Sequence, residues 1–140
     1  MSNRKSMIQK ATALASDVCE IMADGKCCRC GRKGGKAEGF CAHHIIRKGM
    51  GGGNYKTRFT PYNLLWVCTP CHTGNTNSFH NIAREDELEW IKMHEPSHYA
   101  FISDPANRSL LIGNPDTYLD YTITYLASLK EYINEQKRIR

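Results

Sequence analysis

Two Cys-x-x-Cys turns constrain this chain more than any other feature of its sequence. Cys27 and Cys30 form the first pair, Cys68 and Cys71 form the second, and 37 residues separate Cys30 from Cys68. A two-residue spacer lets both thiolates of a pair reach one ion, and structural zinc takes four such ligands in a tetrahedron. The spacing therefore predicts one structural Zn²⁺ site built from all four cysteines.

The remaining cysteines leave two alternatives open. One is a redox Cys-x-x-Cys pair, although that motif is typical of a strand-to-helix turn in a βαβ unit, which this sequence lacks. The other is Cys41 as a competing zinc ligand. Cys19 and Cys28 are expected to be packed or bystander thiols. Four of the seven cysteines fall into metal-type pairs, which favours metal binding over disulfides in a reducing compartment.

Length and hydropathy limit the class of protein. The chain has 140 residues, of which 41% are hydrophobic, and this suits a single domain over residues 1–140. No run approaches the roughly 18 to 20 apolar residues that a membrane helix needs. The first ten residues are polar, with no apolar stretch behind their basic side chains. We therefore expect a cytoplasmic protein with no membrane partner.

Positive charge is concentrated in one part of the chain. Residues 25–60 carry nine Lys and Arg against one acidic residue, whereas the whole chain has a net charge of +5. A polyanion is the partner that such a segment attracts most strongly, and nucleic acid is the commonest polyanion. The alternative is a loop made basic for solubility.

Apolar spacing divides the rest of the chain into helices around a metal-organised segment. It predicts a helix over residues 4–23, a small module over 25–81, and a second helix over 82–95 that ends at Pro96. Two short strands are expected at 99–102 and 110–112. A last helix runs to about residue 137, with Asn114 as its cap. Its apolar band is broad, which indicates either an intramolecular groove or a homodimer contact.

A second set of residues lies between and beside the cysteine pairs. It consists of four short elements, in the order Cys41-Ala42-His43-His44-Ile45-Ile46, Gly51-Gly52-Gly53, Asn63-Leu64-Leu65 and Cys71-His72. Together these elements closely resemble the HNH endonuclease superfamily over about residues 26–80. The resemblance implies an α+β fold, namely a zinc-organised ββα-metal module flanked by N-terminal and C-terminal helices. It also implies a bacterial or phage-infected host cell as the setting.

The resemblance assigns roles to four residues. It implies that His44 is the general base that activates water, while His43 and His72 bind a catalytic metal. Asn63 would orient the His44 backbone and ring. Histidine is a suitable residue type for the general base, because an imidazole titrates near neutral pH and can take a proton from water at working pH.

Two departures from the family pattern leave the metal site open. Arg47 stands where a proline is common, and Thr76 stands where many relatives have another ligand one helical turn after His72. Asn75, Asn77 or His80 are the other residues that would complete the site. With two imidazoles assigned, the candidate catalytic metals are Mg²⁺, Mn²⁺, Co²⁺, Ni²⁺ and Zn²⁺.

The leading function is thus a metal-dependent DNA endonuclease. Its expected contacts to DNA phosphates are the basic side chains of Arg32, Lys33, Lys36, Arg47, Lys48, Lys56 and Arg58. One alternative is a zinc-ribbon module that binds DNA without cutting it. Another is a nuclease acting on branched DNA, because residues 56–59 faintly resemble phage recombination nucleases of the NinG/Rap kind. A nuclease directed at RNA is the third.

Overall fold

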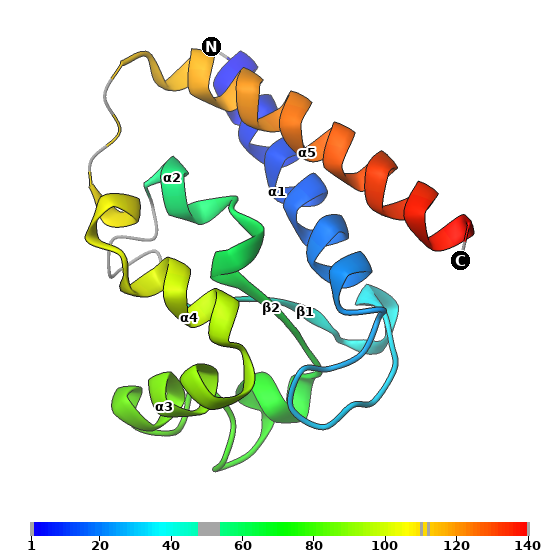
Figure 1. The fold of residues 1–140 in the computed structure, drawn as a ribbon, viewed down its shortest axis with the longest axis vertical. Helices are drawn as coiled ribbons and strands as arrows, with labels where there is room; N and C mark the ends of the chain where they lie inside the picture. The colour runs from blue at the N-terminus through cyan, green and yellow to red at the C-terminus, as the bar shows by residue number, and fades with distance from the viewer. Residues whose placement is uncertain (1, 48–53, 110, 112, 140) are drawn as a thin grey trace.

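The computed structural model describes residues 2–47, 54–109, 111 and 113–139. Within these ranges the fold is mixed α+β, mostly helical with one two-stranded sheet (Figure 1). The main helices are α1 (Ser2–Met22), α3 (Arg84–His94), α4 (Pro96–Ser103) and α5 (Pro115–Arg138). In this part of the chain, none of the helices combines the length and the hydropathy required for crossing a bilayer.

The sheet lies in the middle of the molecule. Strand β1 (Cys41–His44) pairs antiparallel with β2 (Leu64–Val67), and His43 lies opposite Leu65 in this register. Figure 1 shows the sheet between the α1 and α5 pair and the α3 and α4 pair. All four residues of β2 are buried, as expected for a short apolar run covered on both faces. Two strands alone are marginally stable in water, so the sheet depends on these helices.

Short helical turns connect the sheet to the rest of the fold. Helix α2 (Tyr55–Arg58) and the 3₁₀ turn η3 (Pro61–Asn63) lead into β2. After β2 the chain forms a π-helical turn, η4 (Pro70–Gly74), and the next regular helix begins at Arg84. His72 therefore lies on a short turn that begins at Pro70, between the two cysteines of the second pair.

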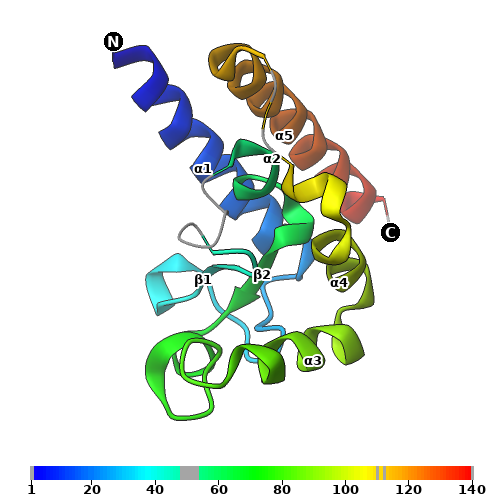
Figure 2. The same ribbon diagram turned by 90° about the vertical axis from the view of Figure 1, so that its left-hand side faces the viewer.

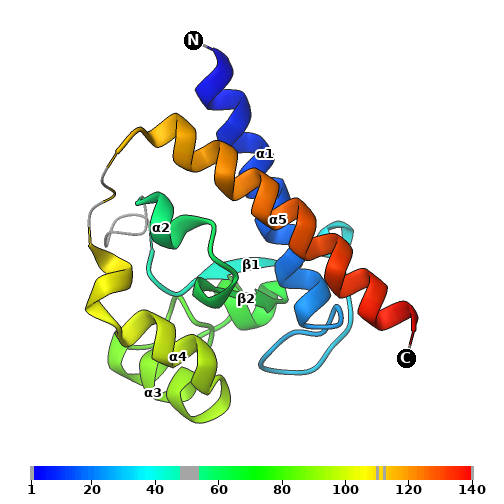
Figure 3. The same ribbon diagram turned by 45° about the horizontal axis from the view of Figure 1, so that its top comes forward.

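Helices α1 and α5 lie against each other and run in the same direction (Figures 2 and 3). Among the described residues, three ion pairs join these helices or the turn that follows α1, at a nearly constant sequence offset of 112 or 113 residues. They are Arg4 with Asp116 at 2.7 Å, Lys130 with Asp17 at 3.0 Å, and Lys137 with Asp24. A constant offset is what two parallel helices with equal rise per residue require.

The helices at both ends of the chain were predictable, and the segment between α3 and α5 was not. The Asn114 side chain accepts a hydrogen bond of 2.8 Å from the Asp116 backbone N–H and so caps α5 as predicted. The strand expected at 99–102 is wrong, because these residues belong to α4. Pro96 occupies the first turn of that helix, where its missing N–H costs nothing, and Ile102 is buried. The strand expected at 110–112 lies mostly outside the described residues.

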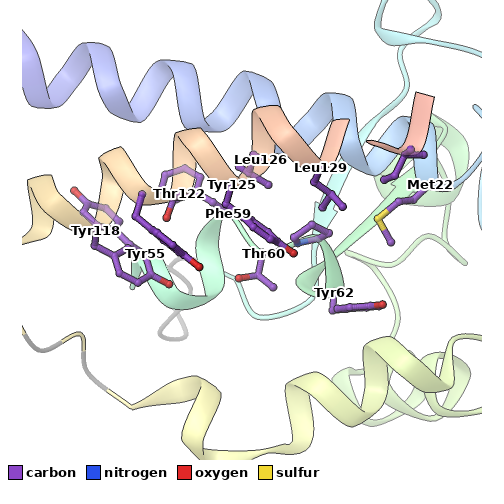
Figure 4. A pocket seen from close by; sticks show the side chains of 13 residues that line it. Met22, Tyr55, Phe59, Thr60, Tyr62, Tyr118, Thr122, Tyr125, Leu126 and Leu129 are labelled. Atoms are coloured by element: carbon purple, nitrogen blue, oxygen red, sulfur yellow. The ribbon is translucent and has the colours of Figure 1, made fainter. Parts of the chain in front are cut away.

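The broad apolar band of α5 has two different surroundings. Leu119, Thr122 and Leu126 are buried. A pocket of about 360 Å³ lies between α5 and the segment 55–62, and tyrosine side chains from both sides line it (Figure 4). Tyr132 lies outside this pocket and is exposed to solvent. The band thus serves an intramolecular groove on one side, and the homodimer contact stays a prediction for the other.

Asp17 of α1 forms ion pairs whose contribution to the free energy of unfolding can be measured. Its carboxylate accepts from Lys130 at 3.0 Å and from Lys36 at 3.2 Å. Burial raises its pKa, but the two lysines outweigh burial and lower it, so the group is ionised at neutral pH. We expect Asp17→Asn to reduce the free energy of unfolding by about 0.5 to 1 kcal/mol in dilute buffer, because the pair is partly exposed.

Urea unfolding at low and high salt checks this prediction. The loss should shrink in 1 M NaCl, where the Debye length falls to about 3 Å. Asp120→Asn on the exposed side of α5 is the matched control and should change little at either salt concentration. An effect of Asp17→Asn that does not depend on salt would contradict an ionic origin.

Candidate metal centres

The four cysteine sulfurs of the two Cys-x-x-Cys turns meet at one place. The ligand atoms of Cys27, Cys30, Cys68 and Cys71 all lie within 4.8 Å of one another. The Sγ atoms of Cys30 and Cys68 are 3.6 Å apart. Four thiolates at about 2.3 Å from a tetrahedral zinc ion lie about 3.8 Å from one another. The donor set and its spacing are therefore compatible with a structural zinc ion.

Backbone hydrogen bonds shape the first turn and attach it to the sheet. Gly31 has φ +76°, a left-handed conformation that favours glycine, and its N–H donates to the Cys27 carbonyl. The Cys28 N–H donates to the Trp66 carbonyl of β2 at 2.9 Å. This bond brings the first cysteine pair next to the end of β2, where Cys68 follows.

The thiols of the chain have different environments, and the pKa of Cys27 is lowered. Burial raises the pKa of Cys27, but backbone N–H groups that point at its sulfur lower it to about 7, which favours the thiolate that a metal needs. Burial raises the pKa of Cys19 and Cys28, and also that of the cluster members Cys68 and Cys71, so the positions of the sulfurs define the ligand set. Cys41 lies outside the four-sulfur cluster, with its sulfur 3.3 Å from Nδ1 of His72. All seven cysteines lie in the described ranges, and each is a free thiol.

Three imidazoles form a second cluster. The ligand nitrogens of His43, His72 and His80 lie within 4.8 Å of one another. Nε2 of His72 and Nε2 of His80 are 2.9 Å apart. Two nitrogens that bind one ion at about 2.1 Å lie about 3.0 to 3.4 Å apart, depending on coordination geometry. The three histidines could hold a divalent metal ion.

The segment between His72 and His80 is folded back on itself. The Phe79 N–H donates to the Cys71 carbonyl at 2.9 Å, and the His80 N–H donates to the His72 carbonyl at 3.0 Å. Arg29, from inside the first cysteine turn, donates to the carbonyls of Cys71 and Asn77. The four-sulfur cluster and the three-imidazole cluster are therefore joined through the same backbone.

His43 is the buried member of the imidazole cluster. Its side chain is 1% exposed, and its ring stacks on Phe79 with centroids 4.8 Å apart. Its Nε2 lies 2.6 Å from Oε2 of Glu87, and its Nδ1 has no hydrogen-bond partner among the described residues. Burial lowers the pKa of His43, and burial with nearby positive charge lowers that of His72 to about 4. Both rings are therefore neutral at pH 7, the form that binds metal.

Asn63 is completely buried and holds together the base of the loop after β1. Its Oδ1 accepts from the Ile46 N–H at 2.8 Å, and its Nδ2 donates to the carbonyls of Ile46 and Thr57 at 3.2 Å each. Its own carbonyl accepts from the Ile45 N–H. Asn63 thus fixes the residues directly after His44 and directly before Arg58.

His44 occupies the other side of β1. Its Nε2 lies 3.1 Å from the Arg58 carbonyl oxygen, which can only accept, so this nitrogen carries the ring proton. His44 also lines a pocket of about 220 Å³ whose opposite wall is α1, including Thr12 and Ser16. Neighbouring side chains of a strand point to opposite faces, which explains why His44 is not part of the three-imidazole cluster.

The basic residues expected to contact DNA have different surroundings. Arg47 donates to Glu87 at 2.7 Å and to the Phe79 carbonyl at 3.2 Å. Lys56 donates to Ser109 and to the Ala106 carbonyl, and Lys36 pairs with Asp17. Arg32 and Lys33 are exposed and Arg58 is half-buried. Lys48 and the glycines at 51–53 lie outside the described residues.

The sequence pattern alone did not select two residues of this region, His80 and Glu87. His80 was one of four open candidates for the additional ligand, and it is the one whose ring adjoins His72. Asn75 uses its side-chain oxygen to accept from the Asn77 N–H instead. Glu87 lies outside the segment that resembles a known family, and no spacing signal in the sequence connects it to His43.

Comparison with models of protein families, with characterised proteins and with solved structures finds no match for this chain. The resemblance to HNH endonucleases therefore rests on the sequence motifs alone.

Removing one cysteine ligand tests the four-sulfur site. We expect purified protein to carry one tightly held zinc ion per chain at these sulfurs, and Cys68→Ser to lose it and to melt at a markedly lower temperature, because a structural zinc ion contributes directly to folding. Cys28→Ala, one residue from a ligand, should keep the zinc ion. Metal content by mass spectrometry and thermal unfolding check both, and full zinc content in Cys68→Ser would contradict the site.

Removing His80 tests the imidazole cluster. We expect His80→Ala to weaken Co²⁺ or Ni²⁺ binding by at least about 10-fold, because it deletes one of three convergent nitrogens. His94→Ala, which removes an exposed histidine of α3, is the matched control and should bind as the unaltered protein does. Isothermal titration calorimetry on zinc-loaded protein measures both, and equal affinities would exclude His80 as a ligand.

Proposed function

We propose that this protein is a metal-dependent DNA endonuclease of the HNH type. The observation that carries the proposal is the arrangement around the end of β1. His44, the last residue of this strand, is held by a backbone carbonyl, and the ligand nitrogens of three histidines converge at its neighbour His43. Phosphodiester hydrolysis needs both a proton acceptor for water and a cation for the developing charge.

His44 is suited to accept the proton. Because its Nε2–H donates to the Arg58 carbonyl, the neutral ring has its lone pair on Nδ1. Asn63 keeps the chain on either side of this pair in place through its bonds to Ile46 and Thr57. A water molecule beside Nδ1 would lose its proton to His44 as its oxygen attacks the phosphorus atom.

The imidazole cluster is suited to hold the catalytic ion. His43, His72 and His80 would bind it, leaving coordination positions for water and phosphate oxygen. When bound, a divalent cation stabilises the charge on the scissile phosphate and on the leaving oxygen. Three imidazoles favour Zn²⁺, Co²⁺ or Ni²⁺ over Mg²⁺ and Mn²⁺, which prefer oxygen ligands.

The basic segment supports DNA as the substrate. Exposed Arg32 and Lys33 would bind phosphates of the backbone, and Arg58 lines the same pocket as His44. Such contacts position a duplex without reading its bases, so we propose cleavage with little sequence preference.

Cleavage of supercoiled plasmid tests the proposal. Purified protein is incubated with Mg²⁺, Mn²⁺, Co²⁺, Ni²⁺ or Zn²⁺ in separate reactions, and we expect nicked or linear product with at least one of them. His44→Ala should reduce the cleavage rate by about 100-fold or more, because the general base is lost. His94→Ala is the matched control and should cut normally.

Two other results would change the assignment. Equal cleavage by His44→Ala and the unaltered protein would remove His44 from the reaction. Salt-sensitive DNA binding without cleavage, on plasmid and on branched DNA alike, would indicate a zinc-ribbon module that binds DNA only.

A further inference from the structure

A carboxylate outside the motif segment is in contact with the three-imidazole cluster. Glu87, on α3, is 0% exposed, and it meets three cationic or polar groups. Its Oε2 lies 2.6 Å from Nε2 of His43, while its Oε1 accepts from Arg47 at 2.7 Å and from Arg84 at 2.9 Å. Burying a carboxylate is costly unless it is paired, so this arrangement needs all three partners.

The contact fixes which nitrogen of His43 carries the proton. Oε2 is an acceptor, so a short bond to it requires Nε2–H on the ring. The opposite tautomer would direct a nitrogen lone pair at an anion at 2.6 Å. His43 therefore has its lone pair on Nδ1, the buried nitrogen that has no partner among the described residues.

Glu87 is also linked, through Arg47, to the backbone next to His80. Arg47, which donates to its Oε1, donates with the same Nη2 atom to the carbonyl of Phe79, the residue before His80. Phe79 in turn stacks on the His43 ring. One carboxylate thereby holds the His43 ring and, through Arg47, the backbone next to His80.

We propose that Glu87 is a positioning residue that directs Nδ1 of His43 to a divalent metal shared with His72 and His80. The inference rests on the proposed metal site, and it makes α3 part of that site although α3 lies beyond the motif. Carboxylates that accept the second N–H of a ligating histidine fix its tautomer and strengthen it as a ligand, and their loss typically lowers metal affinity about 10- to 100-fold.

Nitrogen NMR of the unaltered protein tests the tautomer directly. Protein labelled with ¹⁵N, holding zinc at the cysteines but cleared of weakly bound metal by dialysis against citrate, is recorded at pH 7.5 by two-bond ¹H–¹⁵N correlation. His43 is assigned by its absence in His43→Gln. We expect a protonated Nε2 and a bare Nδ1, and one further equivalent of Zn²⁺ should shift Nδ1. A bare Nε2, or a Zn²⁺-induced change at Nε2 instead of Nδ1, overturns the proposal.

Glu87→Gln tests the energetic part. We expect Co²⁺ affinity at the histidine site to fall about 10- to 100-fold, with zinc at the cysteines and helix content unchanged. Glu89→Gln, an exposed neighbour on the same helix, is the control. A folded Glu87→Gln protein with unaltered Co²⁺ affinity overturns the proposal, and if that variant does not fold, the NMR result decides.

The test of Glu87 and the test of the proposed nuclease activity can give different results. Protein that binds Co²⁺ through Nδ1 of His43 and loses affinity in Glu87→Gln, yet cuts no DNA, upholds the role of Glu87 and refutes the nuclease. If the unaltered protein and Glu87→Gln cut DNA at the same rate and bind Co²⁺ with the same affinity, the nuclease is upheld and the role of Glu87 is refuted.

Discussion

The closure of the two cysteine turns on each other is the constraint on which the rest of this structure depends. Cys27 and Cys30 come from the segment after α1, whereas Cys68 and Cys71 follow β2, so their convergence closes a long loop that contains β1 and its histidines. Loop closure costs entropy, and four bonds to one ion would offset that cost in the way a disulfide does. Since Cys71 directly precedes His72, the same closure sets where the imidazole cluster forms.

Strand β1 then divides the chemistry between its two faces. His43 points toward α3 and a buried carboxylate, while His44 points toward α1 and a pocket. Each ring is oriented by an acceptor of a different kind, a carboxylate for His43 and a backbone carbonyl for His44. A carboxylate strengthens a metal ligand, whereas a neutral carbonyl only selects the tautomer, so the two environments would suit the metal binding and the proton transfer that we propose.

Sequence alone predicted the features that a recognisable motif or period encodes. The Cys-x-x-Cys spacing predicted the four-sulfur cluster, apolar periodicity predicted α1 and α5, and Asn114 marked the start of the latter. The pattern did not select His80, because the turn between His72 and His80 is set by hydrogen bonds such as those from Arg29, which have no sequence period. Glu87 was missed because its pairing with His43 belongs to no recognisable motif, whereas the equally distant Cys27 and Cys71 each lie in a Cys-x-x-Cys turn. The strand expected at 99–102 was wrong because Pro96 begins a helix as readily as it ends one.

The flanking helices explain how the small segment 25–81 is held in a stable fold. A two-stranded sheet with one cluster of thiols and one of imidazoles buries too little apolar surface to fold alone. Outside β2, the large buried apolar side chains described in the segment 25–81 are those of Phe40, Ile45, Ile46, Phe59 and Phe79. Helix α1 packs on both strands of the sheet and is itself held by α5, while the His43 ring stacks on Phe79 and contacts Glu87 of α3. Helix α3 contributes buried Ile91 to the core and also supplies Glu87, so core packing and the orientation of the His43 ring depend on the same helix.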